Sequence, residues 1–480
     1  MKARILAPEN RKWLTLAALS FALFMIMLDN TVVNVALPSI QRDLGIGISE
    51  LEWIVTAYAL SFAVFLLTGG KLADRYGRRR IFLIGLTTFT FSSLACGLAG
   101  SAGLLIGARA VQGVGAALMM PATLSIISAV FHARERGMAI GIWAGVSAMA
   151  LAIGPLIGGV LTEKVNWNWI FYINVPVGIL GIVAAFVLVP ESRDMSAVQR
   201  LDLPGLITSA VAVFALTYAL IEANTYGWTS ARILGLFVLF VVALGAFVLL
   251  ETHQTAPMLD LSLFRNGTFA GANTVALMVS LAMFGVFFFI SLFMQNILHY
   301  SAIKAGATFL PMTILIILVA PLAGAMSDRL GSRWLMAGGM LLVAASLVVF
   351  AQLDQGSGFW NILPGLLIGG VGMAMTMSPM TSATLSAVSV DKAGVASGVL
   401  NTFRQVGGSL GIAIGGAILA SYVSVPPQSP QFADEFVNGL HHSLYTSAGI
   451  AFAAALVAAV TIRKQRVAAP APEAVEAVAA

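Results

Sequence analysis

The sequence predicts an all-α integral membrane protein with fourteen membrane-spanning helices. Hydrophobic residues make up 59% of its 480 residues and charged residues only 10%, and the mean hydropathy is +0.92. A soluble domain carries roughly 25% charged residues, so a soluble fold is excluded. Two further observations support the prediction: a series of apolar stretches of membrane-crossing length, and a basic turn that occurs twice.

The apolar stretches set the number of spans, because a helix that crosses a bilayer needs about 20 mainly apolar residues. The charged N-terminal segment and the apolar run after it are similar to a signal peptide, but the run continues to Pro38, which indicates an uncleaved first helix. Segment 423–442 contains three prolines and is expected to be irregular, and the tail 467–480 is expected to be disordered. The fourteen stretches are approximately 13–37, 51–70, 80–99, 103–130, 138–161, 168–189, 203–222, 232–250, 269–295, 305–326, 334–352, 360–385, 395–422 and 443–462.

The positive charges predict the orientation. With the N-terminus in the cytoplasm, 20 of the 26 Lys and Arg residues fall on the cytoplasmic side and four on the other. The remaining two, Arg109 and Arg404, lie within spans. By the positive-inside rule, this asymmetry favours an even number of spans with both termini cytoplasmic, in a plasma (inner) membrane.

Positive charge is most concentrated in the segment Gly70–Arg80, where five cations lie between two apolar stretches. We expect a tight turn there, in which Gly70 and Gly77 let the backbone reverse and Asp74 pairs among the cations.

A weaker copy of this turn, Gly324–Arg333, contains Asp328 and Arg329 and lies 254 positions later (328 − 74). A repeated polar turn between apolar spans predicts two related membrane halves.

Asp29 and Arg109 are the ionisable residues most deeply placed in the first half. A carboxylate inside a membrane is costly, and Asp29 can serve proton or cation coupling; alternatively, it is a packing carboxylate held by Asn30 or Asn34. Arg109 shares a helical face with Gln112 and can tune the pKa of a nearby carboxylate, with Asp29 as the candidate partner. The alternative for Arg109 is a structural counter-charge or a side chain that reaches the membrane interface.

Arg404 and Glu222 are ionisable residues within or at the end of later spans. Arg404 either meets an anionic group of a substrate or simply pairs or reaches the interface, and the sequence favours neither. Glu222 lies beside Asn224, Tyr226 and Trp228, a composition typical of a membrane interface, so solvation is favoured over a place in the substrate pathway.

The fifth span is rich in glycine: Gly145 is followed by Gly154, Pro155, Gly158 and Gly159. Proline kinks a helix, and small residues four apart let a neighbouring helix approach closely. This pattern suits a hinge between two conformations, although ordinary helix packing produces the same pattern.

Phe288 and Met377 represent two groups of adaptable apolar side chains, the phenylalanines of the ninth span and the methionines of the twelfth. Such side chains suit a site for lipophilic compounds, and they also suit packing against lipid.

Several classes of function are disfavoured. The sequence contains no phosphate-binding glycine loop, no His-Glu-x-x-His motif and one cysteine, Cys96, so ATP hydrolysis, a metalloenzyme and an intrachain disulfide are not expected. We expect no cofactor and no metal site. The net charge of +5 follows from the topology and does not indicate a nucleic-acid partner.

The motifs together resemble the major facilitator superfamily, specifically its fourteen-span drug:proton antiporter branch, over almost the full chain. Asn168 departs from the branch, which usually carries arginine there, and the tenth span lacks the buried acid that some such exporters have. The segments that carry the resemblance are Leu28–Pro38, Gly70–Arg80, Leu105–Ala117, Gly145–Gly159, Trp167–Gly178 and Leu201–Gly205.

The resemblance implies two six-helix bundles (1–190 and 266–466) around a central cavity, with two extra central helices in a linker (191–265). It implies a role in proton coupling for Arg109 and an antiporter motif centred on Gly154 and Pro155. It also implies gating roles for Gly70, Asp74, Arg75, Gly77 and Arg78, with Asp328 and Arg329 as their counterparts in the second half.

The expected function is the export of a lipophilic small molecule in exchange for protons. Export of an endogenous metabolite, lipid or antibiotic, or proton-coupled symport, remains the alternative. A sensor or scaffold is disfavoured because the links between spans are too short for a signalling domain. Expected partners are the substrate, protons and the bilayer, and a periplasmic adaptor is left open.

Overall fold

The computed structural model describes residues 8–193, 202–254, 257–388, 392–426 and 429–463, and within these ranges all regular elements are helices. The all-helical prediction is therefore confirmed. The elements are α2 (Pro8–Leu44), α3 (Ile48–Tyr76), α4 (Arg78–Gly97), α5 (Ala102–Val130), α6 (Ala133–Lys164), α7 (Trp169–Tyr172), α8 (Asn174–Leu188), α9 (Leu203–Tyr226), α10 (Ala231–His253), η1 (Leu261–Arg265), α11 (Gly267–Leu292), η2 (Phe293–Ile297), α12 (Ala302–Thr308), α13 (Leu310–Leu330), α14 (Ser332–Phe350), α15 (Phe359–Ser386), α16 (Ala393–Tyr422) and α17 (Phe432–Thr461).

Thirteen helical segments of the described chain are long and apolar enough to cross a membrane. They include the paired elements α7–α8, α11–η2 and α12–α13, each of which forms one continuous span. The one remaining predicted span, the fifth (138–161), falls on the 32-residue helix α6, in which several side chains are not described. The length and apolarity of each stretch therefore predicted the positions of the thirteen spans well, because both are local properties of the chain.

The end of the chain departs from the prediction of an irregular segment over 423–442. Helix α17 begins at Phe432, so the second half of that segment is helical. The prolines precede the helix, and Asp434 and Glu435 lie in its first turn, where negative charge is favourable. The Glu435 carboxylate also accepts the backbone N–H groups of Ser424 and Val425 at 2.6 and 3.2 Å, which ties the preceding loop to the helix.

The basic turn is also shorter than predicted. Helix α3 continues through Gly70 to Tyr76, and only Gly77, with φ = 110°, reverses the backbone. The Gly77 N–H donates to the Ala73 carbonyl, and α4 begins at the next residue. The copy behaves in the same way at Gly331, where φ is 87°. Because one residue with positive φ ends a helix and redirects the chain, Gly70 is not needed for the reversal.

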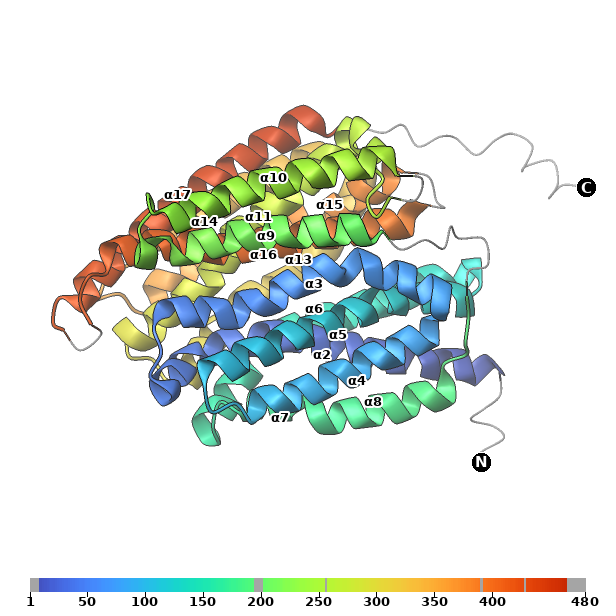
Figure 1. Cartoon of the computed structure of the whole chain (residues 1–480), viewed down its shortest axis with the longest axis horizontal. Coiled ribbons are helices and arrows are strands. Elements are labelled where there is room, and N and C mark those ends of the chain that lie inside the picture. Colours follow the sequence, from blue (N-terminus) through green and yellow to red (C-terminus); the bar gives the residue numbers. More distant parts are fainter. Residues whose placement is uncertain (1–7, 194–201, 255–256, 389–391, 427–428, 464–480) are drawn as a thin grey trace, which may run out of the picture.

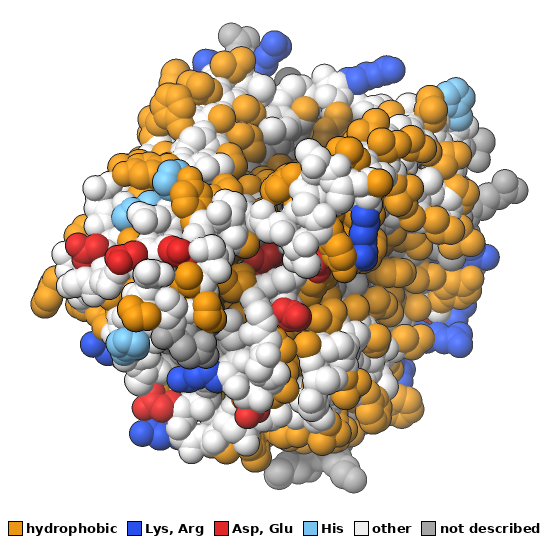
Figure 2. All heavy atoms as spheres, turned by 60° about the vertical axis from the view of Figure 1, so that its left-hand side comes forward, with side chains coloured by type: hydrophobic (Ala, Val, Ile, Leu, Met, Phe, Trp, Pro, Cys, Tyr) orange, Lys and Arg blue, Asp and Glu red, His pale blue; other side chains and the backbone are white. Residues whose placement is uncertain are grey.

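The helices lie side by side along the long axis of the molecule, with α2–α8 on one side and α11–α17 on the other (Figure 1). Helix α9 runs along this boundary next to α3 and α16, and α10 packs against the outer side of α9. Of the thirteen spans, α10 is the least buried. We call the end that carries the Gly77 and Gly331 turns and the described chain ends the basic face, and the other end the opposite face. Large apolar side chains cover the flanks between them, while acidic side chains gather on the opposite face (Figure 2).

Candidate functional site

Asp29 and Arg109 form an ion pair inside the N-terminal half, between α2 and α5. The guanidinium Nη1 lies 2.5 Å from the Asp29 carboxylate, and the two side chains are 1% and 0% exposed. Gln112 donates to the second carboxylate oxygen at 3.0 Å, and Asn174 of α8 donates to the same oxygen at 3.4 Å. The Asp29 carboxylate is therefore held by three side chains from two helices that are distant in sequence.

Arg109 is equally well enclosed. Its Nε donates to the Ile54 carbonyl at 3.2 Å, and its guanidinium carbon lies 4.3 Å from the centre of the Tyr58 ring and 5.8 Å from that of Phe171. Aromatic faces attract a cation, and the paired carboxylate balances its charge. Because both charges are compensated within one half of the molecule, the pair carries no net charge toward its surroundings.

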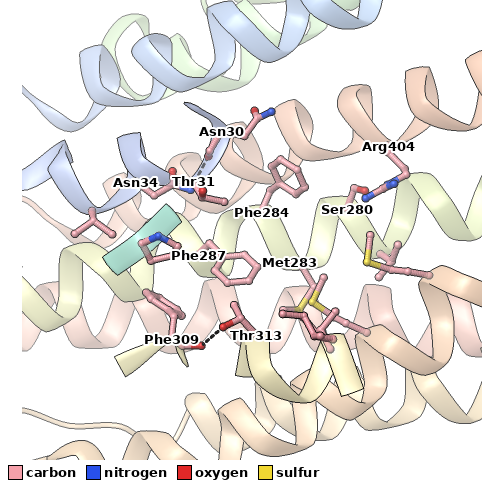
Figure 3. A pocket seen from close by; sticks show the side chains of 17 residues that line it. Asn30, Thr31, Asn34, Ser280, Met283, Phe284, Phe287, Phe309, Thr313 and Arg404 are labelled. Atoms are coloured by element: carbon pink, nitrogen blue, oxygen red, sulfur yellow. Dashed lines mark hydrogen bonds between the residues drawn. The ribbon is translucent and has the colours of Figure 1, made fainter. Parts of the chain in front are cut away.

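A cavity lies between the two halves of the molecule, next to the turn of α2 that follows Asp29 (Figure 3). Its polar lining from α2 consists of Asn30, Thr31 and Asn34. Most of the wall is apolar, and Arg404 of α16 is the only charged residue among its described lining. The remaining lining residues are Val35, Pro155, Val279, Ser280, Met283, Phe284, Phe287, Phe309, Thr313, Ile316, Ile317, Met373 and Met377.

The two halves are packed backbone to backbone between this cavity and the opposite face. A Cβ atom on Gly306 of α12 would collide with the Pro155 carbonyl of α6, and one on Gly159 would lie 2.5 Å from the Ala302 carbonyl. On its other side α6 packs against α2, where Gly154 faces Thr31 and Gly158 faces Val32. Small residues thus let α6 touch both halves at once.

Hydrogen bonds reinforce this closure. Ser291 Oγ donates to the Asn34 carbonyl and Gln295 Nε2 to the Val35 carbonyl, both at 2.9 Å. The Ile303 N–H donates to the Glu163 carboxylate at 3.0 Å. A second cavity, lined by α3, α5 and α16, lies between the halves toward the basic face. The described contacts therefore close the molecule at the opposite face.

The basic turn is held by an ion pair within it and by hydrogen bonds to three segments that are distant in sequence. Arg78 is paired with Asp74 at 3.0 Å and donates to the Ser125 carbonyl of α5 at 3.3 Å. Lys71 Nζ donates to the Pro257 carbonyl at 2.6 Å, which links the turn to the segment after α10. The Glu191 carboxylate accepts the Arg79 N–H at 3.1 Å and occupies the space beside Gly77.

Comparison with known proteins identifies the architecture. The family model described as Major Facilitator Superfamily matches residues 19–412, most of the chain. The chain belongs to the Major Facilitator Superfamily. It is therefore a membrane transporter and not an enzyme.

Several relatives of this superfamily are similar along most of the chain. The multidrug resistance protein Stp of Mycobacterium tuberculosis (strain CDC 1551 / Oshkosh) is 38% identical over 86% of this chain and 76% of its own length. The tetracenomycin C resistance and export protein of Streptomyces glaucescens is 37% identical over 86% and 77%. The puromycin resistance protein pur8 of Streptomyces alboniger is 36% identical over 95% and 92%.

Solved structures confirm the superfamily fold. A bacterial homologue of the human lysosomal transporter Spinster, crystallised in an inward-facing and unoccupied conformation, has a TM-score of 0.69 with 17% identity and covers 96% of this chain and 99% of its own. The crystal structure of the peptide transporter POT in complex with sulfate has a TM-score of 0.66 with 16% identity over 92% and 93%. At such identities the likeness concerns the fold alone.

Within this superfamily fold, the structure separates the predicted pathway residues into two groups. Asn34, Met377 and Arg404 line the cavity. The other three lie outside its walls: Gln112 belongs to the Asp29 network, Phe288 packs against Phe289, and Glu222 accepts hydrogen bonds from Ser49 and Trp53 of α3, both at 3.1 Å.

The other candidate residues from the sequence also differ in their surroundings. Gly145 is exposed with open space around it, so it does not share the close packing of Gly154, Gly158 and Gly159. Arg75 lies over the Tyr76 ring, 5.0 Å from its centre. Asp328 and Arg329 lie on α13, but their side chains fall outside the described residues, as does the tail 467–480.

Sequence reasoning passed over two buried polar groups. Asn174 and Ser93 complete the Asp29 network, with a hydrogen bond of 3.0 Å between them. Glu52 of α3 is only 2% exposed and lies against Gly416 of α16. In each case the available signal was a polar residue within an apolar run, which marks a site when it lies in the interior of a membrane protein.

Proposed function

We propose that this transporter exports lipophilic drugs or related small molecules across the plasma (inner) membrane in exchange for protons. The observation that carries the proposal is the apolar cavity between the two halves, which lies one helical turn from a fully buried carboxylate. Binding sites for lipophilic compounds are concave and mainly apolar with a few polar groups. The drug-resistance names of the relatives support the same class of substrate.

The proposed topology has fourteen spans, with two six-helix bundles (1–190 and 266–466) and two extra helices, α9 and α10, between them in the chain. We place the basic face, with both termini, in the cytoplasm, because the positive-inside rule favours that side for Lys and Arg. The close packing at the opposite face would then separate the cavity from the outside.

Asp29 is the proposed proton carrier and Arg109 its partner. Protonation of Asp29 would remove the counter-charge of the buried Arg109, so proton binding at Asp29 would weaken this contact between α2 and α5. A proton that enters from outside would neutralise Asp29 and release Arg109. Because Asn30 and Thr31 directly follow Asp29, a shift of this turn of α2 would change the cavity wall.

The gate on the cytoplasmic side is proposed to be the turn at Gly77 with Asp74, Arg75 and Arg78, and its counterpart at Asp328 and Arg329. The Asp74–Arg78 pair joins the end of α3 to the start of α4 and, through Ser125, to α5. The proposed hinge is α6, whose residues Gly154, Pro155, Gly158 and Gly159 contact both halves.

Transport by purified protein in proteoliposomes tests the proposal. A pH gradient is imposed, and movement of a fluorescent lipophilic compound is recorded for wild type, Asp29→Asn and a control, Asp434→Asn, which changes an exposed acid on the opposite face. We expect gradient-driven transport in wild type and control and its collapse in Asp29→Asn. A transport rate that does not depend on the pH gradient would refute antiport. Gradient-driven transport by Asp29→Asn would show that the coupling residue is not Asp29.

A further inference from the structure

Arg404 has no partner among the residues that the structure describes. It forms no ion pair there and donates no hydrogen bond to a described acceptor. Its side chain lies beside Ser280 at one end of the cavity, while Asn30, Thr31 and Asn34 lie toward the other end (Figure 3). A half-buried cation thus points into a mainly apolar chamber whose other described lining residues are uncharged.

A compound bound in this cavity would meet the charge of Arg404. No Asp or Glu is among the described residues that line the cavity. The nearest acid along α2, Asp29, is already neutralised by Arg109 in an ion pair that does not line the chamber. The electrostatic field in the cavity is therefore dominated by one uncompensated positive charge.

An unpaired charge in a site of low dielectric is costly, and a ligand of opposite charge removes that cost when it binds. A guanidinium offers parallel N–H donors that match a carboxylate or another planar oxyanion. A cationic compound would instead lose its hydration and meet a like charge without any acid to balance it.

We infer that the cavity selects anionic amphiphiles, namely aromatic compounds with one acidic group, whose ring packs among Phe284, Phe287 and Met283 while the acidic group pairs with Arg404. The inference rests on the proposed function, since it names the substrate class of that same cavity. The hydroxyl of Ser280 adds a hydrogen-bond donor beside the guanidinium. The amides of Asn30 and Asn34 remain for polar substituents at the far end.

Binding of three compounds with one ring system tests this charge selectivity: 2-naphthoate, 2-naphthamide and 2-naphthylmethylammonium. Calorimetric titration of the full chain in detergent, with protein-free micelles as a blank, gives the three affinities. We expect wild type to bind the naphthoate at least tenfold more tightly than the amide, and the ammonium most weakly. An ammonium that binds as tightly as the naphthoate, or no binding of the naphthoate, would overturn the inference.

Substitutions of Arg404 test whether this residue causes the preference for the naphthoate. Arg404→Gln is expected to abolish the preference for the naphthoate, while Arg404→Lys retains most of it because the charge remains. Arg232→Gln is the matched control, since Arg232 lies over the Tyr226 ring outside the cavity. An unchanged preference in Arg404→Gln would overturn the assignment, and the wild-type comparison decides the question if that variant fails to fold.

The same three compounds, loaded into proteoliposomes with a pH gradient, separate this inference from the proposed function. Gradient-driven transport of the ammonium but not of the naphthoate would refute the anionic selectivity and leave drug export standing. Binding of the naphthoate without gradient-driven transport of any compound would refute proton-coupled export and leave the charge selectivity of the cavity standing.

Discussion

Gly306 of α12 lies directly against the backbone carbonyl of Pro155 in α6, so that the two halves of the transporter touch at a point where a side chain would not fit. Pro155 also lines the central cavity, with its neighbours Gly154 and Gly158 against α2. One short stretch of α6 therefore connects the cavity wall, the first helix and the C-terminal half. This connection supports the hinge that we propose at these residues.

Gly306→Val tests this contact. The valine side chain would overlap the Pro155 carbonyl, so we expect the halves to be held apart at the opposite face and transport to fall at least tenfold. Gly235→Val is the matched control, because a Cβ at Gly235 of α10 meets nothing within 4 Å. Equal transport by the two variants would show that close approach at Gly306 is not required.

The Asp29–Arg109 pair predicts strongly coupled effects on stability. Asp29→Ala should lower the free energy of unfolding by about 3–5 kcal/mol, because it leaves Arg109 buried without a counter-charge. The double variant Asp29→Ala, Arg109→Met should recover much of this loss, since no lone charge remains. Thermal unfolding in detergent measures both effects, and additive losses in the double variant would contradict the coupling.

Glu52 is expected to reduce stability in the wild type. Its carboxylate is buried against Gly416, accepts no hydrogen bond from a described donor, and has the acid Glu222 as its charged neighbour. We expect Glu52→Gln to raise the melting temperature by about 2–4 °C, the shift that roughly 1 kcal/mol produces in a large domain.

The control for Glu52 is Glu50→Gln on the same helix. Glu50 is exposed, and its carboxylate accepts the Gly47 N–H, a bond that glutamine can also make. The melting temperature of Glu50→Gln should therefore equal that of wild type. A lower melting temperature in Glu52→Gln would show that Glu52 has a stabilising partner in the folded protein.

Asp202, at the start of α9, predicts a pH dependence of stability. Burial raises the pKa of Asp202, but hydrogen bonds from the Gly205 N–H, the Gln254 amide and the Met258 N–H outweigh it and hold the pKa below its ordinary value. A carboxyl with a lowered folded-state pKa stabilises the protein above its unfolded pKa of about 3.9, and this contribution is lost as the pH falls through the folded value.

Asp202→Asn should therefore be less stable than wild type at pH 7, with a difference in melting temperature that shrinks below about pH 4. Melting curves of both proteins from pH 7 to pH 3 measure this difference. Asp434→Asn, at an exposed acid, provides the comparison. A difference that stays constant with pH would refute the role assigned to the ionised Asp202 carboxylate.

The sequence by itself determined the membrane class, the positions of the spans and the repeated turn, because hydropathy, helix length and charge placement are local properties of the chain. It also singled out Asp29, Arg109 and Arg404, since an ionisable residue within an apolar run is visible without a structure.

Tertiary structure decided what surrounds those residues. Only packing of α2, α5 and α8 shows that Asp29 is enclosed by Arg109, Gln112 and Asn174, whereas Arg404 faces the cavity without a described partner. Helix periodicity gives the face that a residue occupies but not which distant helix covers that face. The site is therefore set by contacts between helices far apart in the chain.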